Sequence, residues 1–117
     1  MKTRGTAVVI RDGKVLLVRD KGHKNFSLPG GGVKKNEPSL AAAVRELYEE
    51  LRMSARKAER FFKWDFKGAA SEHKVSLIET DDDIKLGDKE LAEFIWWDRK
   101  KAIPRYPHID QILKKMA

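Results

Sequence analysis

The feature that most constrains the fold is one amphipathic helix placed between segments of strand-like sequence. Over residues 38–51 the apolar residues recur at helical spacing and share one stripe: Leu40, Val44, Leu47 and Leu51. Asn36 or Glu37 is expected to cap this helix, and Pro38 suits its first turn. Small residues at 41–43 allow another segment to approach the helix closely.

Segments on both sides of this helix are predicted to be strands. Residues 6–10 and 14–18 are apolar runs joined by Asp12-Gly13, which is typical of a tight turn between antiparallel strands. Three later segments are also expected to be strands: 57–66, 73–80 and 94–97. Residues 107–116 form a short amphipathic helix at the end of the chain. This order predicts a single α/β (α+β) domain over residues 1–117.

Composition excludes several classes of site. The chain has 117 residues and no cysteine, so disulfides, thiolate zinc sites, iron–sulfur clusters and cysteine nucleophiles are ruled out. No apolar run approaches the length of a membrane span. The first residues lead straight into a strand-like run, so no signal peptide and a cytoplasmic location are expected.

Charge is uneven along the chain. The net charge is +7, yet acidic residues gather in 36–51 and 79–93. A basic surface attracts phosphates, nucleotides and nucleic acid, and an acidic island inside it is suited to a cation. Lysines that only solvate the surface explain the net charge equally well.

The central helix carries a cluster of carboxylates next to a glycine-rich loop. Glu46, Glu49 and Glu50 are spaced i, i+3, i+4, where like charges repel. A solvated helix face and a divalent cation both account for this pattern, since Mg²⁺ prefers oxygen ligands. The loop at 30–32, after Pro29, lets backbone run close to a ligand. It lacks the Gly-Lys-Ser/Thr ending of a P-loop.

Taken together, the loop and the helix resemble the Nudix box of MutT-like proteins. The matching residues, at the family's spacing, are Gly31, Glu37, Arg45-Glu46-Leu47 and Glu49-Glu50. The lead-in Leu28-Pro29-Gly30-Gly31 is also similar to the family's, with Phe26 where an aromatic residue is common.

One position of this box, which runs from Gly31 to Met53, departs from the family pattern. Arg52 stands where the family has a glycine that ends the helix in a left-handed conformation. Two outcomes are open. Either Arg52 adopts that conformation at a cost of about 1–2 kcal/mol, or the helix continues through Met53.

The resemblance implies a fold, a reaction and a set of site residues. The fold is an α/β/α sandwich with a mixed β-sheet, a catalytic helix over about 38–52 and a C-terminal helix over about 107–116. The reaction is hydrolysis of a nucleoside diphosphate linked to another group. By resemblance, Mg²⁺ or Mn²⁺ is bound by Glu46, Glu49, Glu50 and the Gly30 carbonyl. Arg45 orients the glutamates with Glu37 as its ion partner, Gly31 supports the site, and Glu90 is a further carboxylate ligand.

The substrate side of the site is less constrained. Phe26 and Trp97 are candidates for stacking on a nucleobase, and Arg4 is a candidate for contacting phosphate. Three hypotheses follow: a hydrolase of small nucleotides, a non-catalytic nucleotide- or RNA-binding module, and an RNA 5′-end pyrophosphohydrolase. The protein is expected to be a monomer or a homodimer.

Overall fold

The computed structural model describes residues 1–87 and 90–117. Within these residues there are two α-helices, α1 (Ser39–Leu51) and α2 (Pro107–Lys115), and one short 3₁₀ helix, η1 (Phe62–Trp64). Its strands are β1 (Lys2–Val8), β2 (Ile10–Arg11), β3 (Lys14–Asp20), β4 (Gly30–Gly32), β5 (Lys57–Arg60), β6 (Phe66–Lys67), β7 (Ser71–Glu79) and β8 (Leu91–Trp97). None of the helices in these ranges is long and apolar enough to cross a membrane.

The strands form two sheets. The larger has the order β4-β1-β7-β5, with β6 paired to β7, and the smaller has the order β2-β3-β8. β1 and β7 run parallel, from Lys2 opposite Ser71 to Val8 opposite Leu77, whereas the other pairs are antiparallel. The larger sheet is therefore mixed, as expected.

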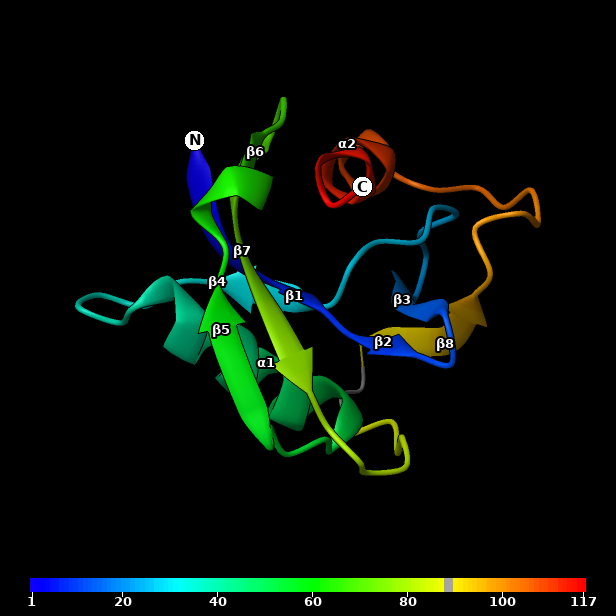
Figure 1. Cartoon of the computed structure of the whole chain (residues 1–117), viewed down its shortest axis with the longest axis horizontal. Coiled ribbons are helices and arrows are strands. Elements are labelled where there is room, and N and C mark those ends of the chain that lie inside the picture. Colours follow the sequence, from blue (N-terminus) through cyan, green and yellow to red (C-terminus); the bar gives the residue numbers. More distant parts are fainter. Residues whose placement is uncertain (88–89) are drawn as a thin grey trace.

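Alternate residues of the strands contribute to two separate cores. Ala7 and Val9 pack in the core that holds α1, whereas Val8 packs in the core that holds α2. β3 divides in the same way, since successive side chains of a strand point to opposite faces of the sheet. α1 and α2 lie on opposite sides of β1 (Figure 1), which confirms the predicted α/β/α sandwich.

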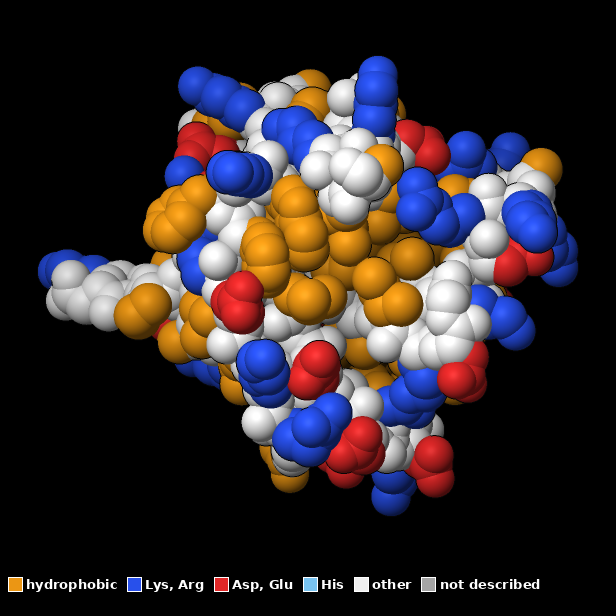
Figure 2. Space-filling view, in the orientation of Figure 1, with side chains coloured by type: hydrophobic (Ala, Val, Ile, Leu, Met, Phe, Trp, Pro, Cys, Tyr) orange, Lys and Arg blue, Asp and Glu red, His pale blue; other side chains and the backbone are white. Residues whose placement is uncertain are grey.

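The surface in the orientation of Figure 2 combines an apolar centre with a mixed charged rim. Hydrophobic side chains gather between β7 and α2. Trp64, Leu77 and Met116 are partly buried and pack against the α2 core. Lys and Arg side chains alternate with Asp and Glu around them. On this face the positive net charge does not form one continuous basic surface.

The predicted boundaries of both helices are close to those observed, but the predicted cap is wrong. α1 has Pro38 at its N-cap with no side-chain cap, so neither Asn36 nor Glu37 caps it. The carboxylate of Glu37 instead accepts hydrogen bonds from the Lys34 amide and from Arg45.

The prediction of one continuous strand over 57–66 is also wrong. β5 ends at Arg60, and the chain turns through η1 before β6. Both guanidinium nitrogens Nη1 and Nη2 of Arg60 donate to Asp65 at 2.8 Å, and Phe61 stacks on Trp64 at 4.0 Å. These contacts close a turn in which Phe62 is exposed, although its spacing from Trp64 suggested a strand.

α1 ends in the left-handed conformation that the family pattern requires. Arg52 has φ 55° and ψ 32°, and its amide donates to the Tyr48 carbonyl at 2.8 Å. The amides of Lys85 and Gly87 then donate to the Leu51 and Glu50 carbonyls. The loop before β8 therefore covers the last carbonyls of the helix, and the alternative of a helix continuing through Met53 is wrong.

Because Arg52 is a non-glycine residue with positive φ, we expect Arg52→Gly to stabilise the fold. The gain should be about 1 kcal/mol, since the backbone strain that is relieved exceeds the added chain entropy of glycine. Urea unfolding measures it. Arg52→Ala is the matched control, because it removes the guanidinium over Tyr48 but keeps the strained backbone. Equal stability of the two variants would contradict this explanation.

Candidate active site

Arg45 is the centre of an ion-pair network on α1. Its guanidinium donates to both carboxylate oxygens of Glu37 at 2.8 and 3.0 Å, and to Glu46 at 2.7 Å. It also reaches Glu49 at 3.3 Å and the Gly32 carbonyl at 3.1 Å. Hydrogen bonding from Arg45 lowers the pKa of Glu37 to about 2, and the bond to Glu37 raises the pKa of Arg45. The network fixes the direction of the Glu46 carboxylate relative to the glycine loop.

Glu50 lies apart from this network and is 7% exposed. One carboxylate oxygen accepts a long hydrogen bond of 3.4 Å from the Gly30 amide. Burial, followed by the charge of Glu46, raises the pKa of Glu50 to about 8, while the charge of Arg4 acts in the opposite sense. A carboxylate with such a pKa is stabilised in its charged form by any cation that binds beside it.

The glycine loop lies against β1 on one side and the α1 carboxylates on the other. A Cβ on Gly31 would be 2.4 Å from Cδ of Glu46, so Gly31 leaves the space that this carboxylate occupies. Gly30 has φ 144°, and a Cβ there would be 2.2 Å from the Gly5 carbonyl oxygen. The absence of side chains at these positions is what brings the loop backbone within reach of Glu46 and Glu50.

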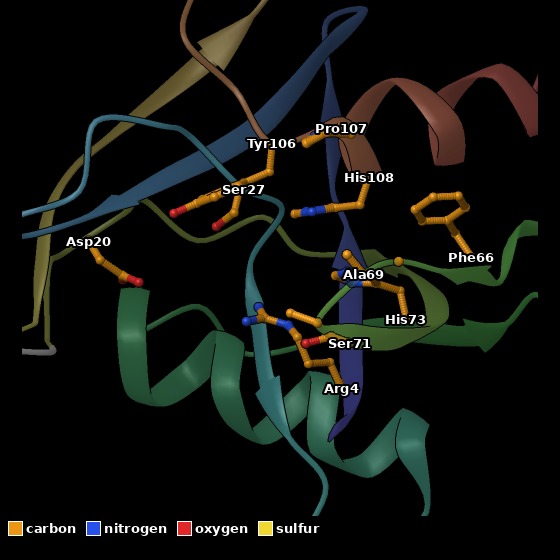
Figure 3. A pocket seen from close by; sticks show the side chains of 12 residues that line it. Arg4, Asp20, Ser27, Phe66, Ala69, Ser71, His73, Tyr106, Pro107 and His108 are labelled. Carbon is orange, nitrogen blue, oxygen red and sulfur yellow. The ribbon is translucent and has the colours of Figure 1, made fainter. Parts of the chain in front are cut away.

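A cavity of about 470 Å³ lies beside this cluster. Its wall includes Arg4 of β1 and Asp20 at the end of β3, whose charges both influence the pKa of Glu50. On its other side lie His73, Tyr106 and His108 (Figure 3). The cavity and the carboxylate cluster are therefore neighbouring parts of one region.

Comparison with known proteins identifies the family. The model of the NUDIX domain matches residues 1–116. This chain belongs to the Nudix family. The family predicted from the box is thereby confirmed.

Curated relatives and solved structures agree with this family. The RNA pyrophosphohydrolase of Klebsiella pneumoniae (strain 342) is 26% identical over 113 residues, which cover 80% of this chain. The chain spans only 64% of the length of that relative.

Among solved structures, the MutT NUDIX hydrolase from Burkholderia pseudomallei has a TM-score of 0.84 at 23% identity, with 99% of this chain and 98% of that chain covered. An ADP-ribose pyrophosphatase from Streptococcus suis has a TM-score of 0.76 at 18% identity, with coverage of 98% and 89%. These likenesses confirm the predicted Nudix fold.

The oxygen atoms of the Nudix box fit a divalent cation that takes its remaining ligands from water and substrate. In the described ranges no three His, Asp or Glu side chains converge as one metal cage. Mg²⁺ usually takes one or two protein carboxylates together with water and substrate phosphates, so a closed cage is not required. The buried carboxylate of Glu50, with its raised pKa and only a long amide contact, is the feature that a cation would satisfy.

The predicted substrate-binding residues lie in different environments. Arg4 lines the cavity beside the Nudix box. Trp97 is 4% exposed in the α2 core, where its indole NH donates to the Lys101 carbonyl. Phe26 is 7% exposed in the same core. Both residues also line a second cavity, so the stacking of Phe26 or Trp97 on a base stays a prediction.

Glu90 lies immediately before β8, as expected from the sequence, and is exposed. Its backbone carbonyl accepts a hydrogen bond from the Lys21 amide at 2.7 Å, which ties this loop to the end of β3. Positions 88 and 89 of the predicted acidic segment lie outside the described residues.

Two histidines of the cavity were not among the predicted site residues. His73 is 5% exposed and stacks on His108 with ring centres 4.2 Å apart. One signal was present in the sequence. His73 lies two residues before Val75, and residues two apart on a strand share a face.

Proposed function

We propose that this Nudix protein is a metal-dependent hydrolase that cleaves a pyrophosphate bond in a nucleoside diphosphate-linked compound. The observation that carries the proposal is the surroundings of Glu50. This buried carboxylate lies on the same helix as Glu46 and against the Gly30 amide, and its raised pKa is the expected property of an unsatisfied cation ligand.

The proposed ligands of Mg²⁺ or Mn²⁺ are Glu46, Glu49, Glu50 and the Gly30 carbonyl, with Glu90 as a further carboxylate. When bound, the cation neutralises pyrophosphate charge and makes water more acidic. Arg45 holds Glu46 in place, and Glu37 holds Arg45. Glu46 or Glu49 takes the proton of the attacking water as the phosphorus–oxygen bond to the leaving group breaks.

A second candidate is hydrolysis at the triphosphate end of RNA. Relatives named RNA pyrophosphohydrolase match over most of this chain, and the net charge of +7 favours a polyanionic substrate. RNA turnover should fall steeply with added salt, whereas turnover of a small nucleotide should change little. A non-catalytic binding module remains the competing hypothesis.

A hydrolysis screen tests the proposal. Ordinary and oxidised nucleoside triphosphates, ADP-ribose, diadenosine polyphosphates and 5′-triphosphate RNA are incubated with the protein and Mg²⁺ or Mn²⁺, and products are resolved by chromatography. We expect turnover of at least one compound, and its loss when EDTA removes the metal.

Glu46→Gln should reduce that turnover by roughly a hundredfold or more, because it removes one proposed ligand and its charge. Glu79→Gln is the matched control, since it removes the same charge from an exposed side chain at the end of β7. Folded protein that binds nucleotide but hydrolyses none of these compounds would support the binding module instead.

A further inference from the structure

The cavity beside the Nudix box is lined by side chains that can donate hydrogen bonds. Its volume of about 470 Å³ is within the usual range of small-molecule pockets. Phe66, Ala69 and Pro107 supply apolar wall, and the polar groups project from β1, β7 and the start of α2 (Figure 3).

Arg4 is the first of these donors. Its Nε atom is buried, and it has no hydrogen-bond partner in the part of the chain that the structure describes. In the sheet, Arg4 lies between Gly32 of β4 and His73 of β7, and it lines the cavity together with both histidines. Since Arg4 lines the cavity, the terminal nitrogens of its guanidinium are the donors that a ligand with matching acceptors would meet.

His108 provides a second donor, and its tautomer follows from its contacts. The Leu28 amide donates to Nε2 of His108 at 3.2 Å, so Nε2 carries no proton. Burial lowers the pKa of His108 to about 3, so the ring is neutral at pH 7. The ring proton is therefore on Nδ1, which makes Nδ1 a donor.

His73 stacks on His108 and is tied to the interior of β1. Its Nδ1 lies 2.8 Å from the hydroxyl of Thr6, which is fully buried. This bond holds the His73 ring in place. The stacked His108 ring, and with it the Nδ1 donor of His108, is thereby fixed in position. The one carboxylate that lines the cavity in the described ranges, Asp20, lies across it from the histidines (Figure 3).

The two purine bases differ in the groups that they would present to these donors. Guanine presents two adjacent acceptors, O6 and N7, whereas adenine places an amino donor beside N7. An arginine fork matches the O6 and N7 pair and meets the adenine amino group donor to donor. Guanine and hypoxanthine also have a donor at N1, which suits a carboxylate such as Asp20.

We propose that this cavity selects a 6-oxopurine base, with O6 and N7 facing Arg4 and the Nδ1 of His108. The inference rests on the proposed function, because it assigns the base of the nucleotide whose phosphates lie at the Nudix box. It narrows the substrate class to guanine-type nucleotides.

Calorimetric titration with nucleoside monophosphates in EDTA tests the selection without any hydrolysis. We expect GMP and IMP to bind alike, because both carry O6 and N7. AMP and 7-deaza-GMP should bind more weakly than GMP by roughly tenfold or more. Since all four ligands carry the same phosphate, the differences report the base alone.

Substitutions at Arg4 complete the test. Arg4→Met should weaken GMP binding roughly tenfold and leave AMP binding nearly unchanged. Arg4→Lys keeps the charge but loses the fork, so it should bind both nucleotides with little selectivity. Lys2→Met removes one positive charge from an exposed position of the same strand and should preserve the preference for GMP.

Two outcomes would overturn the proposal. One is equal affinity of the wild-type protein for GMP and AMP. The other is an equal loss for both nucleotides in Arg4→Met, which would make Arg4 a phosphate ligand. If the preference for GMP is present but no compound is hydrolysed, the proposed function fails and the base selection stands. Comparing kcat/KM for GTP and for triphosphate RNA that begins with G separates a free nucleotide from an RNA end.

Discussion

Glu50→Gln is expected to abolish turnover and at the same time to make the protein more stable at alkaline pH. Loss of activity of roughly a thousandfold follows if the Glu50 carboxylate is a cation ligand. The amide keeps the shape of the side chain, and its oxygen still accepts the Gly30 hydrogen bond. Wild-type and variant proteins are compared under the conditions of best turnover.

The stability gain has a defined pH dependence. Glu50 has a pKa of about 8 in the folded protein and an ordinary value of 4.5, so between these values the folded state binds more protons than the unfolded state. The stability contributed by Glu50 is therefore greatest at low pH and falls as the pH rises towards 8. Because glutamine does not titrate, the difference between variant and wild type should be roughly 3–5 kcal/mol at pH 9 and small at pH 4.

Urea unfolding in EDTA at pH 4, 6 and 9 measures this difference. Added Mg²⁺ should stabilise the wild type and not the variant, since only the wild type retains the proposed ligand. Glu79→Gln removes an exposed carboxylate and should leave the pH profile unchanged. A difference between Glu50→Gln and wild type that is independent of pH would show that burial does not raise the pKa of Glu50.

Gly5→Ala is expected to cause the largest loss of stability. A Cβ on Gly5 would be 2.5 Å from the Ser39 carbonyl oxygen and 2.8 Å from the Ala43 amide nitrogen. Both atoms are backbone of α1, so the helix as a whole has to move away from β1. Overpacking of this kind costs about 3 kcal/mol, or roughly 10 °C in Tm.

Gly31→Ala is the matched comparison, because the atoms nearest to its Cβ would be the carboxylate end of the Glu46 side chain and not helix backbone. This end can rotate, so stability should change little, while displacement of Glu46 should lower activity roughly tenfold or more. Thermal unfolding and turnover are measured for both variants. Equal loss of stability in Gly5→Ala and Gly31→Ala would contradict the close packing of α1 on β1.

The local elements with strong periodicity were predictable from the sequence. The apolar stripe of α1 and the amphipathic pattern of α2 placed both helices within one residue of their observed ends. The small residues at 41–43 correctly suggested a close neighbour, since Ala42 and Ala43 face Gly5. The segment 57–66 was not predictable in this way, because the pairing of Arg60 with Asp65 outweighs the alternation of its aromatic residues.

The sequence by itself determined the family and the residues that carry its chemistry, because the spacing of Gly31, Glu37, Arg45 and the glutamates is local to one loop and one helix. The tertiary structure alone decided their environments. Burial beneath the loop raises the pKa of Glu50, whereas the network around Arg45 lowers that of Glu37. The tertiary structure also placed His73 of β7 against His108 of α2, because the packing of a helix on a sheet brings together residues that no local pattern relates.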